Sequence, residues 1–357
     1  MLKRNLLFFA VISFWITLIG VVLYSPSEKA TFDTKSLNLF SWGDILEPSV
    51  IAEFEKKTGI KVNFSFYGSN EEMITKLKAT QGVGYDLIVP SDYSVEILVK
   101  SGLLQPIDTS KLNFLHRLHP KFLNHFFDTN NHYSLPFSWE LFILGIDSEF
   151  FQGRKINPSW KMVFDIPTVD YLITMPNDPF QTLALASFYL FGGIEQINDA
   201  QLNEITALLT AQKKHVNAYA DSRADYFLAT KNSAIAIASS SYIYRTMRRF
   251  PFVQFLIPQE GSCITIENLC IPRYSQKKDL SYQLINFLYT KEAMKTHFDT
   301  YATFPTVTDL LEEISNDPQM RPIIEFVLSS EKLHFTRVLT DPKKMLNAWV
   351  QIKTKYP

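Results

Sequence analysis

Hydrophobic and polar positions follow two different periods in the segment between residues 36 and 102. Some stretches alternate at every second position or are short apolar runs, as half-buried or buried strands do. Others repeat apolar residues at helical spacing, and Gly59 follows the first of these as a helix-ending residue. The expected elements are strands over 36–42, 61–66 and 85–90 and helices over 47–58, 69–80 and 95–100. This alternation predicts an α/β domain with a largely parallel sheet.

Beyond residue 102 the pattern is less regular. Residues 103–135 are rich in Asn, His and Pro and predict a loop-rich region. No internal repeat and no low-complexity segment is visible in the sequence. The later elements expected are strands over 142–146, 233–238 and 252–257 and helices over 178–191, 202–214 and 280–297.

The N-terminus carries a targeting pattern. Lys3 and Arg4 precede an uninterrupted apolar run from Leu6 to Tyr24, which as a helix would span roughly 28 Å. A positive end followed by an apolar run predicts export, with the rest of the chain outside the cytoplasm. Residues 1–25 are therefore expected to be a cleaved signal peptide or an uncleaved anchor, followed by a linker over 26–35. A periplasmic location is expected in either case, and an uncleaved segment would tether the protein to the inner membrane.

Composition and charge exclude some classes of function. The chain has 357 residues, 46% of them hydrophobic and 20% charged, which is typical of a folded protein of about two domains. Lys plus Arg is 35 and Asp plus Glu is 36, so the formal net charge is −1. Because no basic excess or basic stripe is present, nucleic acid is not expected as a partner.

The usual sequence signals of enzymes and cofactor sites are missing. There is no phosphate-binding glycine loop, no nucleophile elbow and no zinc-protease motif, so neither catalysis nor a cofactor is expected. Cys263 and Cys270 have a spacing that matches no zinc or redox motif. Four histidines gather in the loop region without regular ligand spacing, and surface histidines are favoured there over a metal site: His116, His119, His125 and His132.

Aromatic and acidic residues follow several of the expected strands. Open α/β sheets bind ligands outside the carboxyl ends of their strands. Taken singly, each such residue is better explained as core, helix cap or surface charge. Together, rings beside carboxylates would suit an organic cation. The residues at or after strands are Trp42, Ser91, Asp92, Tyr93, Trp139 and Glu140; Asp178 opens a helix, and Glu267 lies within a strand-like segment.

Several stretches of the chain resemble a known family. They include 39–42, 69–73, 85–91, 107–112, 128–136, 258–261 and 269–272. In these stretches the chain is similar to the periplasmic spermidine/putrescine-binding proteins of ABC importers, and the resemblance covers most of residues 37–310. It implies a two-lobed α/β fold of the type II periplasmic-binding-protein class, with a mostly parallel sheet flanked by helices in each lobe. The ligand would lie in the cleft between the lobes.

The resemblance also implies a ligand site. Trp42, Tyr93 and Phe304 would line the aliphatic chain of a polyamine, and Ser91 would hydrogen-bond one end of it. The carboxylates that would neutralise its amines are Asp178, Asp221 and Glu267. The chain departs from the family in having Ile45, Ser239 and Thr265 where the family has rings, so the aromatic box is thinner.

The thinner box leaves alternatives open. A polyamine is the favoured ligand, and a different small cation or a metal held by the same fold is the alternative. A membrane-anchored sensor domain without transport activity is a second alternative, and a secreted enzyme is a third. ABC permease subunits are the expected partners of a monomeric protein. The resemblance places lobe 1 at 36–139 plus 266–310 and lobe 2 at 140–265 plus 311–357.

Overall fold

The structure is a computed structural model that describes residues 14–15, 35–193, 195–220 and 223–355. The chain divides into two units, Met1–Ser36 and Leu37–Pro357, and the fold concerns the second. The expected leader and linker lie outside the described residues, apart from Phe14, Trp15 and Lys35. None of the helices in the described part is long and apolar enough to cross a bilayer.

The strands form one mixed sheet, whose main path runs in the order β2-β1-β3-β9-β4-β7-β5-β6. The strands are β1 (Ser36–Ser41), β2 (Lys61–Phe66), β3 (Leu87–Ile88), β4 (Ser134–Asp147), β5 (Ile173–Met175), β6 (Val216–Tyr219), β7 (Ile235–Ser239), β8 (Val253–Leu256), β9 (Ser262–Cys270), β10 (Phe304–Pro305) and β11 (Leu333–Phe335). The pairs β1–β3, β5–β7 and β5–β6 are parallel, as strand–helix alternation favours. The long β4 and β9 pair antiparallel with each other, which the alternation did not predict.

The α-helices cover this sheet. They are α2 (Pro48–Thr58), α3 (Asn70–Thr80), α4 (Asp92–Lys100), α5 (Lys161–Phe164), α6 (Pro179–Phe191), α7 (Asp199–Gln212), α8 (Ala224–Ala229), α9 (Ser240–Met247), α10 (Lys278–Leu288), α11 (Lys291–Tyr301), α12 (Thr308–Ile314), α13 (Arg321–Ser329) and α14 (Pro342–Thr354). Short 3-10 turns fill much of the loop-rich region.

Most expected elements are present with bounds shifted by a few residues. Local chemistry explains several of them: Gly59 ends α2 in the left-handed conformation, and the Ser69 side chain caps α3. The expected helix over 280–297 is wrong as a single element. It is two helices, because the Thr290 hydroxyl accepts from the Ala293 amide and starts α11 afresh.

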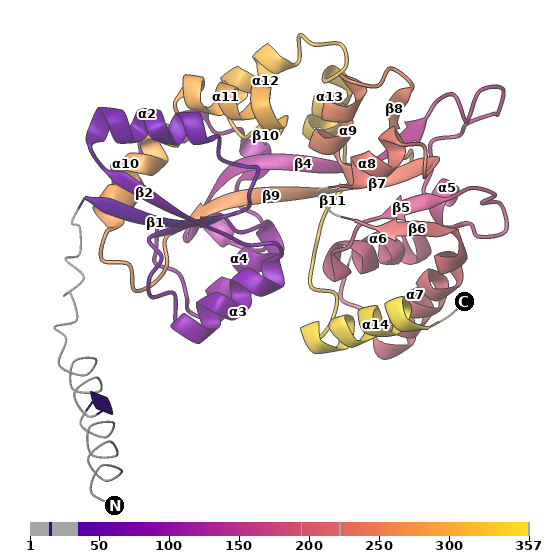
Figure 1. Cartoon of the computed structure of the whole chain (residues 1–357), viewed down its shortest axis with the longest axis horizontal. Coiled ribbons are helices and arrows are strands. Elements are labelled where there is room, and N and C mark those ends of the chain that lie inside the picture. Colours follow the sequence, from indigo (N-terminus) through magenta and orange to yellow (C-terminus); the bar gives the residue numbers. More distant parts are fainter. Residues whose placement is uncertain (1–13, 16–34, 194, 221–222, 356–357) are drawn as a thin grey trace, which may run out of the picture. The chain divides into compact units, whose positions relative to one another are not determined.

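The long strands β4 and β9 connect two groups of elements (Figure 1). One hydrophobic core contains side chains of β1, α2, β3 and α10, and the other contains side chains of β5, α6 and α7. β4 contributes to both cores from opposite faces: Trp139 and Leu141 belong to the first, and Phe142 and Leu144 to the second. This split follows from the two-residue period of a strand.

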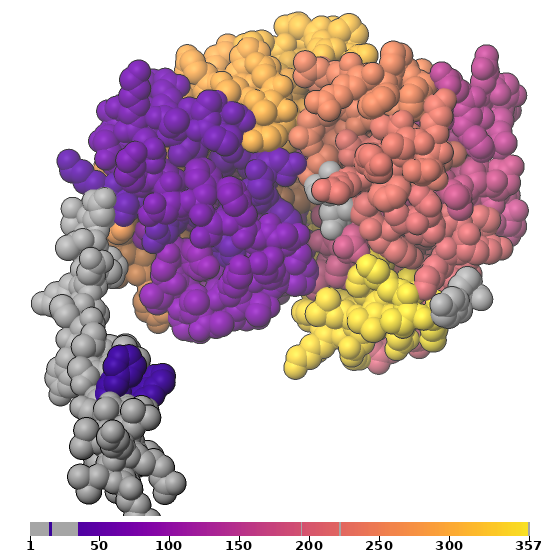
Figure 2. Space-filling model, viewed as in Figure 1, coloured from indigo at the N-terminus to yellow at the C-terminus, as the bar shows by residue number. Residues whose placement is uncertain are grey.

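Two of the expected lobe boundaries fall inside strands, one in β4 and one in β9. Both strands run without interruption through the boundaries at 139/140 and 265/266. At the C-terminal end, α14 packs against α6 and α7 (Figure 1), and the C-terminal segment lies at the surface, yellow in Figure 2. Leu311 and Ile324, in contrast, belong to the first core. The residue bounds of the two lobes therefore stay a prediction, and the structure describes the two cores.

Candidate functional site

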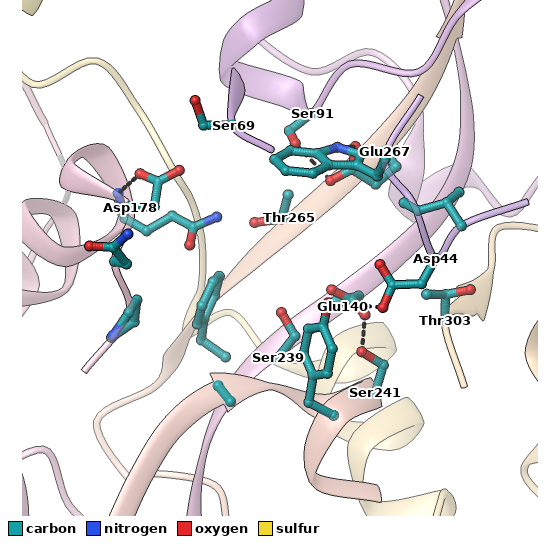
Figure 3. A pocket seen from close by; sticks show the side chains of 18 of the residues that line it. Asp44, Ser69, Ser91, Glu140, Asp178, Ser239, Ser241, Thr265, Glu267 and Thr303 are labelled. Carbon is teal, nitrogen blue, oxygen red and sulfur yellow. Dashed lines mark hydrogen bonds between the residues drawn. The ribbon is translucent and has the colours of Figure 1, made fainter. Parts of the chain in front are cut away.

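A cavity of about 420 Å³ lies where the two groups of elements meet. Its wall is formed by the end of β1, the start of α3, the middle of β4 and β9, the start of α6, and the start of α9. Figure 3 shows Asp178 on one side of this cavity and Glu140 with Asp44 on the other, with Thr265 between them. A ligand in the cavity would therefore touch segments that are far apart in the sequence.

The wall is rich in acidic groups. Among the described residues that line it, the carboxylates are Asp44, Glu71, Glu140, Asp178 and Glu267. Arg245 is the cation of the described wall, and its guanidinium lies 3.5 Å from a carboxylate oxygen of Asp44. The charge of the wall therefore favours a ligand with more than one positive group.

Glu267 lines the cavity from β9 and is held by two donors. The Ser91 hydroxyl donates to one carboxylate oxygen at 2.7 Å, and the Trp42 indole N–H donates to the other at 3.1 Å. Asn70 in turn donates to the Ser91 hydroxyl at 3.1 Å. Burial raises the pKa of Glu267 to about 8, although the Ser91 and Trp42 hydrogen bonds act in the opposite direction.

Glu140 is a second carboxylate of the wall, and it is half-buried. It lies on β4 opposite Thr265 of β9, and the Ser241 hydroxyl donates a hydrogen bond to it. Burial raises the pKa of Glu140, while hydrogen bonds from Ser241 and Ser239 lower it. Side chains of consecutive strand residues point to opposite faces of the sheet. Glu140 therefore reaches the cavity, whereas its neighbour Trp139 does not.

Aromatic rings form another part of the wall. Trp42 packs against Tyr67 with ring centroids 4.6 Å apart, and the Tyr67 hydroxyl donates to the Val89 carbonyl. Tyr242 donates to Asp44 at 3.1 Å and lies under the Arg245 guanidinium. The rings that line the cavity are Trp42, Tyr67, Phe142, Tyr242 and Tyr301. The aromatic wall is thus fuller than the sequence indicated, because four of these rings come from positions that no motif singled out.

Asp178 caps α6 at the edge of the cavity. One carboxylate oxygen accepts from the Gln181 amide at 2.9 Å, as an N-cap does. The other lies 3.0 Å from the Tyr93 hydroxyl, which is also 3.3 Å from Glu71. Tyr93 itself is fully buried and stacks on Phe180 at 5.2 Å. It orients Asp178 rather than forming part of the cavity wall.

Only some of the site residues expected from the sequence line the cavity. Trp42, Ser91, Asp178 and Glu267 line the cavity together. Tyr93 and Phe304 do not. Phe304 is fully buried and stacks on Trp139 with centroids 4.4 Å apart, so the core takes up its ring.

One expected site residue has no described position: Asp221 lies outside the described residues. The positions where the family resemblance implies further rings also line the cavity, and they are Ile45, Ser239 and Thr265.

The histidine-rich loop offers no metal centre in the described part of the chain. No group of three or more His, Cys, Asp or Glu side chains there is placed to share an ion. His119 accepts from the Lys121 amide, and His125 contacts the Lys121 carbonyl and lies 4.1 Å from the Phe335 ring. These contacts give the two rings a structural role.

Comparison with known proteins identifies the family. A sequence model described as bacterial extracellular solute-binding protein matches residues 49–322. The chain belongs to this family. Its members are binding proteins and not enzymes.

Individual relatives carry more specific names. The chain is 30% identical to the spermidine/putrescine-binding periplasmic protein of Salmonella typhimurium, over 87% of this chain and 90% of the relative. It is 29% identical to a putrescine/cadaverine-binding protein of Pseudomonas aeruginosa, over 76% of this chain and 79% of the relative. A putative spermidine/putrescine ABC transporter structure from Listeria monocytogenes superimposes with a TM-score of 0.81 at 27% identity, covering 90% of this chain and 99% of that one. The expected two-lobed, type II binding-protein fold is confirmed.

Proposed function

We propose that this chain is the extracytoplasmic solute-binding component of an ABC importer and that it binds a polyamine in the cavity. The observation that carries the proposal is the wall itself. Several carboxylates and several aromatic rings face one space, and the cation of the described wall is already paired with Asp44. The names of the relatives point to the same class of ligand.

Each part of a polyamine has a matching part of the wall. Glu267 and Asp178 pair with ammonium groups, because an ionised acceptor and an ionised donor form the stronger class of hydrogen bond. The face of Trp42 packs on the methylene chain and attracts the neighbouring cation, which contributes roughly 0.5–2 kcal/mol. Ser91 acts by holding Glu267, and Tyr93 acts by holding Asp178.

Partners and location follow from the same proposal. A protein that delivers a solute to an ABC importer acts with membrane permease subunits on the outer side of the inner membrane. The charged end and apolar run at residues 3–24 agree with export, and an uncleaved run would keep the protein tethered to that membrane.

The proposal is tested by calorimetric titration of the purified full chain with spermidine and putrescine, and with common amino acids and divalent metals as comparison ligands. We expect saturable binding of at least one amine. Glu267→Gln keeps the shape of the side chain but cannot ionise to pair with an ammonium group, and is expected to weaken binding about tenfold or more. Trp42→Ala is expected to weaken it about 2- to 30-fold.

Glu53→Gln is the matched control. Glu53 is an exposed carboxylate on α2 that pairs with Lys57 at 2.6 Å, away from the cavity. It should leave affinity unchanged. If no amine binds and an amino acid or a metal does, the polyamine is the wrong ligand for this site.

A further inference from the structure

The floor of the cavity holds two carboxylates on one face of a pair of antiparallel strands. Glu140 on β4 is opposite Thr265 on β9, and Ser138 is opposite Glu267. Glu140 and Glu267 are therefore diagonal neighbours on the same face, at a backbone separation of about 7–8 Å. Two acidic groups at this spacing can hold two separate ammonium groups of one ligand.

Thr265 lies between these carboxylates with an unused hydroxyl. Its side chain is 6% exposed, it lines the cavity, and its Oγ1 has no hydrogen-bond partner among the described residues. A buried hydroxyl without a partner is unfavourable, and a ligand donor that reaches it removes this penalty. Figure 3 shows Thr265 between Asp178 on one side and Glu140 on the other.

The remaining acidic groups of the wall are engaged differently. Asp44 accepts from the Tyr242 hydroxyl and pairs with Arg245, so a cation is already present beside it. Glu71 shares the Tyr93 hydroxyl with Asp178 at the far side of the cavity. Glu140 accepts its hydrogen bond from a neutral hydroxyl, that of Ser241, whereas Asp44 lies directly beside a guanidinium.

We propose that Glu140 and the Thr265 hydroxyl form a third ammonium site, beside those of Glu267 and Asp178, and make the cavity selective for a triamine over a diamine. This inference rests on the proposed function and deepens it. A triamine uses all three carboxylates, whereas a diamine occupies two of them. Ser241 acts as a positioning residue, because its hydroxyl fixes the Glu140 carboxylate.

The selectivity can be measured because the two ligands depend on Glu140 differently. In Glu140→Gln, a triamine loses the partner of one ammonium group, while a diamine still finds Glu267 and Asp178. Calorimetric titration of the full chain with spermidine and putrescine, at one pH and one salt concentration, should show spermidine weakened about 10- to 100-fold. The affinity for putrescine should change by less than about threefold, because a diamine can still use Glu267 and Asp178.

Two further variants complete the test. Glu53→Gln should leave both affinities and their ratio unchanged, because its carboxylate is exposed on α2. Thr265→Val keeps the volume and removes the hydroxyl, and should lower spermidine affinity in the same direction by a smaller factor. If Glu140→Gln does not fold, as a melting curve without ligand would show, Thr265→Val decides the question by the same ratio.

The outcomes separate this inference from the function beneath it. If both amines bind the unaltered chain and Glu140→Gln weakens them equally, or weakens neither, the third site is wrong while the polyamine function stands. If the unaltered chain binds neither amine, the proposed function fails and the third site fails with it.

Discussion

Glu267 gives ligand binding a dependence on pH. Burial raises its pKa to about 8, so the carboxyl is mostly protonated at neutral pH in the free protein. An ammonium group binds the ionised form, and alkylamines stay protonated up to about pH 10. Affinity is therefore expected to rise by up to tenfold per pH unit between pH 6 and 8 and to level off above. Titrations across this range, in buffers of different ionisation heat, would also count the proton released.

The same pKa has a consequence for the protein without ligand. A carboxyl whose pKa is higher in the folded state than its ordinary value of 4.5 binds its proton more tightly when folded. The contribution of Glu267 to stability is therefore lost as the pH rises from about 4.5 through 8. In Glu267→Gln, amine affinity and the free energy of unfolding should both depend less on pH. An affinity that falls toward pH 8 in the unaltered chain would contradict the assignment.

At the level of single residues, sequence patterns predicted part of the site. Trp42 and Ser91 lie at the ends of expected strands and Asp178 opens an expected helix, and the carboxyl edge of a sheet brings such positions together. Glu267 lies within a strand, and it was the family resemblance that pointed to it. The sequence indicates Glu140 as a strand-end carboxylate, but its place in the cavity wall and its contact with Ser241 depend on β9 and α9, which the local sequence does not encode.

Rings were the least predictable part of the site. Tyr67 and Tyr242 line the cavity, whereas Phe304 stacks in the core on Trp139. An aromatic residue is equally suited to a hydrophobic core and to a cavity wall, so its place depends on neighbours that are distant in the sequence. No single-residue pattern distinguishes these cases.

At the scale of elements, Asp178 combines a helix cap with a ligand carboxylate, and two substitutions separate these roles. Asn is as good an N-cap as Asp, so Asp178→Asn should leave the melting temperature unchanged and weaken amine binding about tenfold. Asp178→Ala should weaken binding and also destabilise the fold by about 1 kcal/mol. Chemical denaturation together with calorimetry measures both effects. A large loss of stability in Asp178→Asn would mean that the charge, and not the cap, holds α6.

Gly145 on β4 marks a close contact between elements. A Cβ built there would lie 2.4 Å from Cδ1 of Ile243 on α9 and 2.9 Å from Cδ2 of Leu228 on α8. Gly145→Ala is therefore expected to destabilise the protein by about 1–3 kcal/mol through overpacking. Gly193→Ala is the control, because no described atom lies within 4 Å of its Cβ position. Denaturant midpoints compare the two, and equal midpoints would show that α8 and α9 yield without cost.

The element order was predictable where each element has one buried face. Within residues 36–102, β2, α2 and α3 are of this kind, and all three are present. β9 is buried along its whole length and β4 nearly so, and a strand buried on both faces has no period to read. Their antiparallel pairing, which builds the cavity floor, was therefore not predictable from local pattern.

At the scale of the whole second unit, the two cores are joined through shared strands. β4 places Trp139 and Leu141 in one core and Phe142 and Leu144 in the other. Tyr93 of α4 adds a cross-connection, because it belongs to the second core while Val95 and Leu98 of the same helix belong to the first. Loss of one core would remove the packing from one face of β4 and so destabilise the other.

This sharing predicts that residues 37–357 unfold in one cooperative step. Scanning calorimetry of the full chain should show one transition for this unit, and spermidine at 100 times its dissociation constant should raise the whole transition by several degrees, since it adds about 2.7 kcal/mol. Leu183 is fully buried in the second core. Leu183→Ala should therefore reduce the free energy of unfolding by about 2–5 kcal/mol and shift the single transition to lower temperature without splitting it. Two transitions, of which only one responds to Leu183→Ala, would show that the cores are independent. The ligand would then act as a bridge between two separately folded bodies and not as a stabiliser of one.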